Sequence, residues 1–379
     1  MRSEERTGTR SILSDKLPLL TTPVHGGDLQ RAKAAYPHVE DWLDLSAGLN
    51  PDPWPIPEIP QSCFSQLPDG YESLLDAASD YYGHSHLWPV NGSQQGIELL
   101  PQLISRRFEA TGQGFEPSRK KVAVPEEGYQ EHAWCWQKAG FDVYRYRAEA
   151  PAELISCAEA CDVLVVINPN NPTGQIFSRE ELLACHQVLA EKAGCLILDE
   201  AFMDAYELDS QSLADSASDS LIVLRSIGKF FGLAGIRSGF VLAGESTIVQ
   251  LKIMTGPWPV SGVTAWLTEQ MLQDKEWQLL AREKLARQST ALRSLLEDVF
   301  FGAANAGTST RLRLCYTPLF ASLVLAGGED AARKLQQRLA AQGVWIRVFS
   351  NTGRIRLGLP KDEWEIERLE AAFAASTMM

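Results

Sequence analysis

The sequence lacks long apolar segments. No uninterrupted apolar run reaches the roughly 18 residues that a membrane-spanning helix needs, so no part of the chain is expected to cross a bilayer. Residues 1–20 mix both signs of charge and contain no apolar core of the signal-peptide kind, so no secretion signal is expected. Internal repeats and low-complexity tracts are also absent, and the composition is that of a globular protein.

Cysteine is scarce, and its spacing forms no recognisable framework. The seven cysteines are odd in number and contain no C-x-x-C motif, which favours free thiols and a cytoplasmic location. Cys157 and Cys161 lie four residues apart without a histidine beside them. His84 and His86 likewise lack a third ligand, so no metal site is expected.

Positive charge is in deficit, with 35 Lys and Arg against 48 Asp and Glu and a net charge of -13. Binding of a nucleic-acid backbone needs a basic surface, so nucleic acid is excluded as the main partner. An anionic small molecule stays open as a ligand, because a site can gather a few arginines whatever the total charge. The acidity is otherwise accounted for by solubility alone.

The chain of 379 residues is long enough for two domains. Residues 50–60 (N-P-D-P-W-P-I-P-E-I-P) form a connector that can be neither helix nor central strand. Short apolar runs then alternate with helical stretches such as 179–193, a pattern typical of a mostly parallel sheet covered on both faces. These runs are 121–124, 162–167, 195–199, 221–226 and 239–243.

The pattern changes after about residue 257. A long amphipathic helical region at 262–298 precedes four segments that read as strands, at 311–316, 319–326, 344–349 and 354–359. The last two flank S-N-T-G, which indicates a hairpin turn. We therefore predict an N-terminal arm and part of a small domain at 1–45, a large domain at 46–257, and a small α+β domain at 258–379.

Four polar clusters follow predicted strands or open a helix, where open parallel sheets place their ligands. They are N-P-N-N-P-T-G (168–174), Asp199-Glu200, Arg225-Ser226 and V-N-G-S-Q-Q-G (90–96). Each cluster alone is weak evidence. Because all four are expected at one edge of the sheet, together they predict a binding site there.

Lys229 follows a buried strand by three residues and precedes the apolar, glycine-rich F-F-G-L-A-G. Burial in such surroundings lowers the pKa of an ammonium group, which suits an amine that bonds covalently to a carbonyl. The alternative is a solvated surface lysine. Ser226 and Arg237 flank Lys229, and a hydroxyl and a guanidinium so placed suit a phosphate dianion.

Asp199 ends an apolar run, where a carboxylate needs a partner. A protonated pyridine nitrogen would be such a partner, and the alternative is a strand-end cap or an ion pair. The turn from Asn91 to Gln94 offers backbone N–H groups and the positive end of a helix dipole to a phosphate. The alternative there is an ordinary capped helix.

The string S-I-G-K-F-F-G-L-A-G-I-R-S-G-F (226–240), with N-P-N-N-P-T-G and D-E-A-F (199–202), resembles the fold-type-I enzymes of aminotransferase class I and II. The resemblance implies an α/β fold with a mostly parallel seven-stranded sheet in the large domain, a smaller α+β domain, and pyridoxal 5'-phosphate (PLP) as cofactor. It implies that Lys229 forms the Schiff base with PLP. The other implied cofactor contacts are Asp199 (pyridine nitrogen), Asn171 (ring 3'-oxygen), Tyr129 (ring stacking), and Ser93, Gln94, Ser226 and Arg237 (phosphate).

Three further strings, H-G-G-D-L (25–29), D-W-L-D-L-S-A-G-L-N-P (41–51) and G-V-W-I-R-V-F-S-N (343–351), resemble the threonine-phosphate decarboxylases of cobalamin biosynthesis. This resemblance implies a homodimer that decarboxylates L-threonine O-3-phosphate to (R)-1-aminopropan-2-ol O-phosphate. The implied substrate-binding residues are His25, Gly26, Asn50, Arg347 (phosphate) and Arg356 (α-carboxylate). Two strand-borne arginines suit a substrate with two anionic ends, and the alternative for Arg347 is a surface ion pair.

The chain departs from these families at several positions. Phe202 stands where many aminotransferases have tyrosine, Leu67 where many relatives have tyrosine, and two glutamates precede the Gly-Tyr of residues 128–129. A histidinol-phosphate-type aminotransferase and a non-catalytic PLP-fold binding protein are the rival interpretations. H-G-G-D-L and Phe202 weigh against the first, and the intact Lys229 and Asp199 weigh against the second. Because the residues do not show which bond to Cα is broken, the decarboxylase interpretation depends on resemblance.

Overall fold

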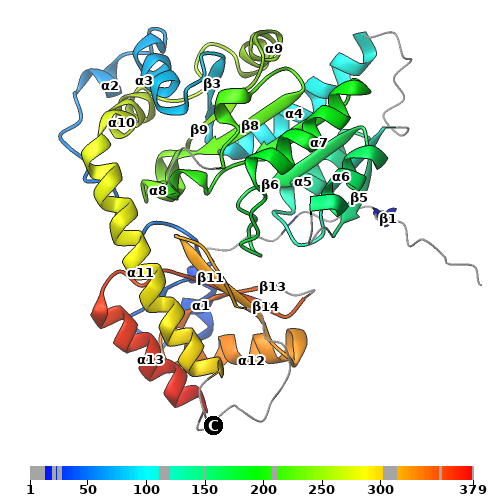
Figure 1. The fold of residues 1–379 in the computed structure, drawn as a ribbon. Coiled ribbons are helices and arrows are strands. Elements are labelled where there is room, and N and C mark those ends of the chain that lie inside the picture. The colour runs from blue at the N-terminus through cyan, green and yellow to red at the C-terminus, as the bar shows by residue number, and fades with distance from the viewer. Residues whose placement is uncertain are drawn as a thin grey trace, which may run out of the picture.

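The computed structural model describes residues 13–18, 23, 28–110, 120–147, 151–206, 211–301, 314–349 and 352–377. These residues form an upper body around a large sheet and a lower body around a smaller one, joined along one side by the long helix α11 (Lys275–Phe301; Figure 1). Among them, no helix combines the length and apolar character needed to cross a membrane.

The large sheet has eight strands in the order β1-β5-β4-β6-β7-β8-β9-β3. The five from β5 to β8 run parallel, and β9 is antiparallel to both of its neighbours. The bounds are β1 Leu13–Lys16, β3 Leu87–Asn91, β4 Lys121–Pro125, β5 Asp142–Tyr146, β6 Val163–Ile167, β7 Cys195–Asp199, β8 Leu221–Ser226 and β9 Ser238–Leu242. The resemblance implied seven strands, and the eighth is the short edge strand β1, antiparallel to β5.

The central strands are apolar throughout because helices cover both faces of the sheet. In β6 every residue is buried; Leu164 and Val166 enter one core, and Val163 and Val165 enter the other. The first core also contains residues of α3 (Glu72–Tyr82), α6 (Pro151–Ala160), α7 (Arg179–Glu191) and α10 (Gly262–Gln273). The second contains residues of α4 (Gly92–Ala110), α5 (Glu131–Lys138) and α9 (Glu245–Thr255).

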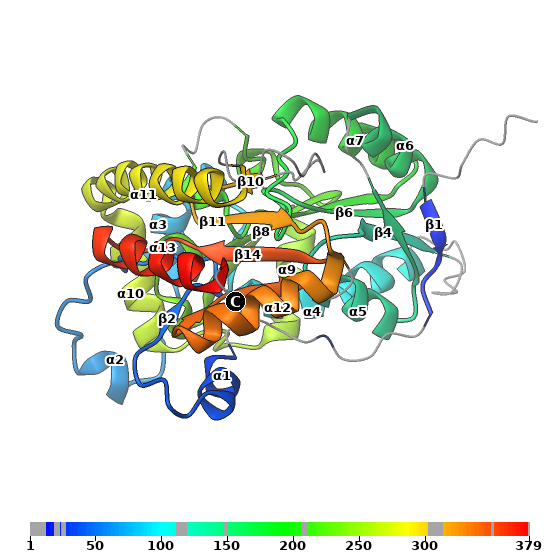
Figure 2. The ribbon, with the colours of Figure 1, turned by 90° about the horizontal axis from the view of Figure 1, so that it is seen from below.

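The smaller sheet is antiparallel, in the order β10-β11-β14-β13. Its strands are β10 Leu314–Tyr316, β11 Phe320–Val324, β13 Arg347–Phe349 and β14 Arg354–Gly358. Helices α11, α12 (Gly328–Ala341) and α13 (Glu363–Thr377) cover its lower face (Figure 2). Strand β2 (Leu43–Asp44) pairs with β12 (Val344–Trp345), so residues 43–44 join the lower body, whereas β1 belongs to the large sheet. The exact domain boundaries stay a prediction.

The chain between the two bodies is bonded to the short helix α8 (Ile227–Phe230). Residues 51–60 form neither helix nor strand, as predicted. The backbone N–H of Asn50 donates to the Lys229 carbonyl (3.0 Å), and that of Trp54 donates to the Phe231 carbonyl (2.9 Å). Two further short helices, α1 (Leu29–Ala35) and α2 (Ser62–Ser65), lie on either side of this segment in the chain.

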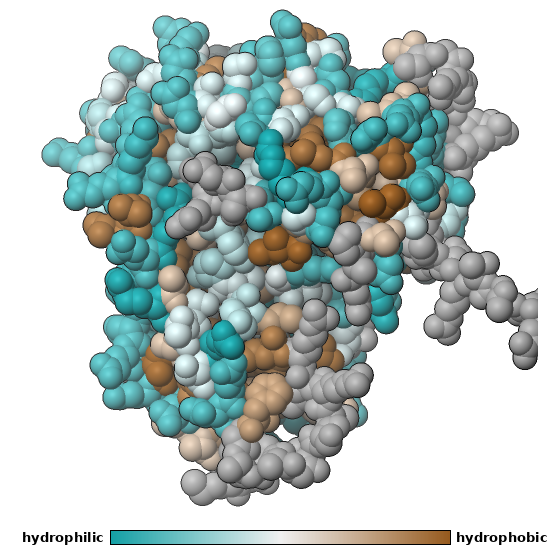
Figure 3. Space-filling view, viewed as in Figure 1, coloured by the Kyte–Doolittle hydropathy of each residue, from teal (hydrophilic) through white to brown (hydrophobic). Residues whose placement is uncertain are grey.

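The surface in Figure 3 is mostly hydrophilic, and its hydrophobic side chains form small separate groups. The large apolar side chains lie instead in the two cores that flank the sheet. Several of the polar residues noted in the sequence are exceptions, because they are buried at the carboxyl ends of the strands: Asp199, Glu200, Arg225 and Ser226.

Candidate active site

Three adjacent parallel strands, β6, β7 and β8, bring their carboxyl ends together. Asn171 follows β6, Asp199 ends β7, and Ser226 ends β8 directly before the helix that carries Lys229. The sequence predicted this convergence because the carboxyl ends of parallel strands share one edge of a sheet. The structure brings these four residues to that edge.

Lys229 is partly buried at the centre of this edge. Burial, followed by the charge of the nearby Arg356, lowers the pKa of its amine to about 8, while the charge of Asp199 opposes the shift. The Nζ atom lies 5.8 Å from the centre of the Phe202 ring. At mildly alkaline pH much of this amine is therefore neutral, which is the form that attacks a carbonyl carbon.

Asp199 is buried, and its two carboxylate oxygens accept different hydrogen bonds. Oδ1 accepts a hydrogen bond from the backbone N–H of Ala201 (3.1 Å), and Oδ2 accepts one from Nε2 of His132 (2.9 Å). Because a carboxylate only accepts, His132 carries its hydrogen on Nε2. Sequence reasoning missed His132, although it lies only three residues after Tyr129, in G-Y-Q-E-H (128–132). The imidazole fixes the direction of the carboxylate and leaves it room for another donor.

A buried ion network lies behind these strand ends. Arg225, directly before Ser226, donates to Glu200, directly after Asp199, with an Nη1–Oε2 distance of 2.5 Å. It also pairs with Asp204. All three charged side chains are almost fully buried. Removing Arg225, or removing both carboxylates, would therefore leave an uncompensated charge in the core. The network therefore holds β7 and β8 in fixed relation at the site.

The start of α4 lies close to Arg237 and to the end of the strand that carries Ser226. Gly92 opens α4 at φ +68°, and a Cβ built on it would come within 2.5 Å of an Arg237 guanidinium nitrogen. A Cβ on Gly239 would meet the Ser93 backbone nitrogen at 2.7 Å, and Gly239 pairs with Ser226 in the sheet. The two glycines thus let backbone N–H groups, a hydroxyl and a guanidinium approach closely, as a phosphate site requires.

Tyr129 and Gln94 are hydrogen-bonded to each other, the Tyr129 hydroxyl donating to Gln94 Oε1 (3.0 Å). Burial, followed by the charges of Glu131 and Asp199, raises the pKa of Tyr129, so its hydroxyl stays protonated. The Tyr129 ring also lies edge-on to His132, with 6.4 Å between ring centres. The side chain is therefore part of this site, while stacking on a bound ring stays a prediction.

Arg347 and Arg356 lie directly opposite each other on the antiparallel strands β13 and β14. Arg356 is only 7% exposed, and burial, followed by the charge of Arg347, lowers its pKa to about 10. Its Nη1 donates to Asn171 Oδ1 (2.5 Å) and its Nη2 to the Ser46 carbonyl (2.6 Å). Nε has no partner within the described part of the chain. Like charges opposed in this way are unfavourable, so the pair is suited to an anion.

Other predicted site residues have different surroundings. Asn50 lies beside α8, where its Nδ2 donates to the Phe230 carbonyl and its Oδ1 accepts the Asp52 N–H, both at 2.9 Å. It therefore supports the helix of Lys229, and a substrate contact stays a prediction. His25 and Gly26 lie outside the described residues. Phe202 packs edge-on against Phe320, with 5.4 Å between ring centres, and makes the site apolar on that side.

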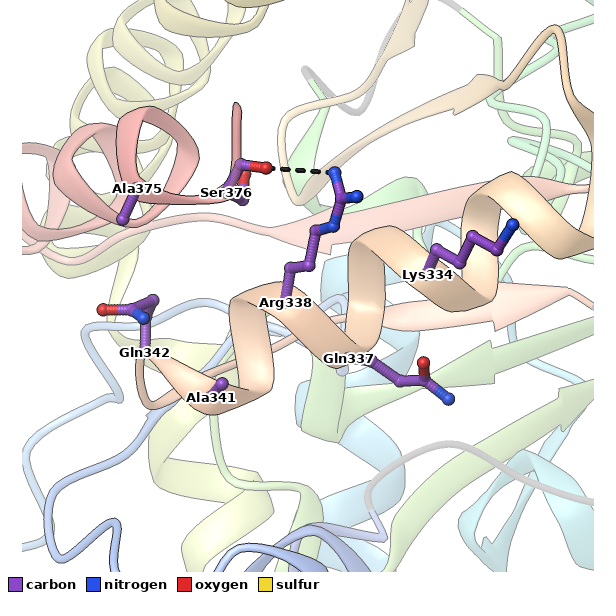
Figure 4. Close-up of a pocket in the computed structure, with 7 residues that line it drawn as sticks. All are labelled: Lys334, Gln337, Arg338, Ala341, Gln342, Ala375 and Ser376. Atoms are coloured by element: carbon purple, nitrogen blue, oxygen red, sulfur yellow. Dashed lines mark hydrogen bonds between the residues drawn. The ribbon is translucent and has the colours of Figure 1, made fainter. Parts of the chain in front are cut away.

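A separate depression of about 230 Å³ lies between α12 and the end of α13 (Figure 4). Its lining residues are Lys334, Gln337, Arg338, Ala341, Gln342, Ala375 and Ser376. One hydrogen bond crosses it, from Arg338 Nη1 to the Ser376 carbonyl (3.0 Å). Lys334 and Arg338 are exposed, and none of the predicted site residues lines it. The predicted site residues therefore lie at the strand ends and not in this depression.

Comparison with known proteins gives three findings. The model of the family "Aminotransferase class I and II" matches residues 58–373. A threonine-phosphate decarboxylase of Pseudomonas aeruginosa is 39% identical over 92% of this chain and 96% of its own length, and one of Sinorhizobium sp is 36% identical over 93% and 97%. The crystal structure of histidinol-phosphate aminotransferase from Sinorhizobium meliloti in complex with pyridoxal-5'-phosphate has a TM-score of 0.75, covering 94% of this chain and 96% of its own, at 18% identity. At that identity the structural likeness establishes the fold alone.

Proposed function

The chain belongs to the aminotransferase class I and II family, and on that premise we propose that it is a PLP-dependent decarboxylase of L-threonine O-3-phosphate. The expected family and fold are confirmed by the family match and by the structural neighbours. The names of the two relatives, each aligned over more than nine-tenths of both chains, support the substrate. The product would be (R)-1-aminopropan-2-ol O-phosphate, which places the reaction in cobalamin biosynthesis.

The observation that carries the proposal is the opposed arginine pair. Arg347 and Arg356 are register partners, and Arg356 is buried with one N–H unsatisfied in the described part of the chain. A substrate with a carboxylate and a phosphate would give each guanidinium a charged acceptor, and charge-assisted pairs are the stronger kind of hydrogen bond. Arg356, beside Asn171, would take the α-carboxylate, and Arg347 would take the phosphate.

The residues at the strand ends fit PLP. Within the described residues, the buried Asp199 carboxylate accepts hydrogen bonds from a histidine and a backbone N–H, so a protonated pyridine nitrogen would complete its surroundings. Ser93, Ser226 and Arg237 would hold the cofactor phosphate, and Lys229 would bond to the cofactor aldehyde. When bound, PLP supplies an electron sink for the pair of electrons that the departing CO2 leaves at Cα.

The chain's own groups then have separate tasks. Arg347 and Arg356 would orient the substrate, and Phe202 with Phe320 would keep water from one side of the site. The bond between Cα and the carboxylate carbon breaks, CO2 leaves, and a proton is added at Cα. Lys229 Nζ, whose pKa is lowered to about 8, is the group suited to carry that proton.

Release of CO2 from L-threonine O-3-phosphate is the expected result when the purified protein is loaded with PLP. One CO2 should form for each 1-aminopropan-2-ol phosphate, and the bound cofactor should return to its starting spectrum after each turnover. A histidinol-phosphate-type aminotransferase would instead convert its cofactor to the pyridoxamine form with an amino donor alone. That conversion, without CO2, would overturn the proposal.

We further propose that the enzyme is a cytoplasmic homodimer. Four large apolar side chains are exposed around α2, α10 and the segments beside them: Ile56 (54%), Phe64 (61%), Leu67 (69%) and Trp258 (54%). Phe64 lies in α2, which packs against α10, and the other three lie in the chain segments that precede or follow these two helices. Burying them against a second copy would remove apolar surface from water.

Sedimentation should therefore give twice the mass of the chain at assay concentrations, and Leu67→Glu should shift the equilibrium toward the monomer. The control is Trp364→Glu on α13, which changes a side chain that is 60% exposed on the lower body, away from α2 and α10. Its dimer should stay intact. A fully active monomer of the unmodified protein would contradict the proposal.

A further inference from the structure

We propose that the ion pair between Glu127 and Arg354 is a positioning pair that sets the charge of the substrate-anion site and ties the strand of Arg356 to the loop of Tyr129. The inference rests on the proposed function, because it concerns the surroundings of the two arginines assigned to the substrate. It gives a role to one of the two glutamates before Gly128, which the family resemblance leaves unexplained.

Arg354 is the third arginine on one face of the small sheet. It lies two residues before Arg356 on β14, and its partner on β13 is Phe349, two residues after Arg347. Opposed residues and residues two apart along a strand share a face of the sheet. The guanidinium carbons of Arg347 and Arg356 lie 5.4 and 5.9 Å from the Phe349 ring centre. Arg347, Arg354 and Arg356 therefore extend from one patch around Phe349.

This patch faces the loops that follow β4 and β6. Arg356 reaches Asn171 after β6, and Ser322, the register partner of Arg356 on β11, donates to the Pro172 carbonyl (2.7 Å). Arg354 reaches Glu127 after β4, with 2.5 Å between Nε and Oε2. The Glu127 carbonyl in turn accepts Asn170 Nδ2 (2.7 Å). Glu127 thus contacts the strand of Arg356 and both loops of the site.

The ion pair is partly shielded from water, since the side chains of Arg354 and Glu127 are 9% and 25% exposed. A carboxylate held there compensates one of the three positive charges of the patch. Arg356 donates to neutral oxygens, so its charge is not compensated in the same way within the described part of the chain. The patch therefore keeps a net positive charge beside Arg356, and removing Glu127 would add a positive charge about two strand residues from Arg356.

The effect of the ion pair on the charge of the substrate-anion site is tested by the binding of inorganic phosphate. Binding to the PLP-loaded enzyme is measured by calorimetry at low ionic strength. Loading with PLP fills the cofactor phosphate site, so the ion reports on the substrate site. Glu127→Gln should tighten binding on the order of tenfold, and Arg354→Gln should weaken it similarly, because a unit charge changes ~7 Å from Arg356. The double variant should return to within about twofold of the unmodified enzyme.

The positioning role of the ion pair is tested by turnover of L-threonine O-3-phosphate. The double variant restores the charge but lacks the tie, so its kcat should stay several-fold low although its phosphate affinity is normal. Glu127→Asp keeps the charge with a shorter reach, and should also keep the affinity and lose kcat. A double variant or a Glu127→Asp variant with normal kcat would overturn the positioning role.

The matched control is Glu126→Gln, which removes the same charge one residue earlier. It breaks an exposed pair with Arg147, whose Nε lies 2.6 Å from Glu126 Oε2. Its phosphate affinity should stay within about twofold of the unmodified enzyme. If Glu127→Gln and Arg354→Gln shift phosphate binding in the same direction, or not at all, the pair does not set the charge. Opposite shifts in an enzyme that releases no CO2 would instead refute the proposed substrate and keep this inference.

Discussion

Lys229→Ala is expected to remove both the visible absorbance of covalently held PLP and the release of CO2. The variant lacks the Lys229 amine, the group whose pKa is shifted by the charges of Arg356, Asp199 and Arg237. The cofactor can still bind through the contacts proposed for its phosphate and ring, but without a covalent bond. Turnover should fall by about 10⁴-fold or more, as when a covalent nucleophile is removed from other enzymes.

Absorption spectroscopy of the purified variant and the CO2 assay check this expectation together. Lys334→Ala is the control, because it removes an exposed lysine from α12 and should leave both the spectrum and the rate unchanged. If the Lys229→Ala protein keeps the absorbance of a lysine-bound cofactor, another lysine carries it and the assignment of Lys229 is wrong.

Arg347→Ala should lower kcat/KM for L-threonine O-3-phosphate about 30-fold or more. The variant loses a charge-assisted contact in a partly buried site, which costs roughly 2–5 kcal/mol. The rate with L-threonine, which has no phosphate, should change little because the missing contact is never made. Arg356→Ala should weaken both substrates, since each has an α-carboxylate.

The contrast between substrates is the decisive measurement. Both variants keep Lys229, Asp199 and the residues proposed to hold the cofactor phosphate, so a difference between the substrates isolates the anion contact. Steady-state kinetics with both substrates for both variants gives the comparison. Equal losses for Arg347→Ala would mean that this arginine is structural, and the phosphate substrate would then depend on resemblance alone.

The central strands could be predicted from the sequence because they are apolar throughout. Strands β4, β6, β7, β8 and β9 each lie within a residue or two of a predicted run. Strands β3 and β5 were missed because their sequences, L-W-P-V-N and D-V-Y-R-Y, contain proline or charged residues. Strand β3 is at the edge of the sheet, where a proline is tolerated since one side needs no ladder hydrogen bonds.

The helical region predicted at 262–298 is two helices, because the chain breaks at Asp274. The helical periodicity continues across the break and gives no warning of it. The Asp274 carboxylate accepts the backbone N–H of Trp277 (3.0 Å), which stabilises the start of α11. The other oxygen of Asp274 accepts Trp54 Nε1 (2.9 Å), a contact with a residue more than two hundred positions away. The break therefore depends partly on tertiary structure.

The candidate site divides in a similar way. Asn171, Asp199, Ser226 and Lys229 could be located from sequence because they follow recognisable strands. The contacts of His132 with Asp199, and of Glu127 with Arg354, join residues 67 and 227 positions apart. No local pattern encodes such pairs, since each partner alone reads as an ordinary polar residue.

The five residues from Ser46 to Asn50 are a short passage between the two bodies. Ser46 is bonded to Arg356 of the small sheet, and Asn50 to the backbone of Lys229. Gly48 packs so closely that an added Cβ would meet the rings of Phe320 and Phe202 at 3.0 and 3.2 Å. This passage is thus part of the wall of the candidate active site, so a side chain added at Gly48 would also change the shape of the space offered to the substrate.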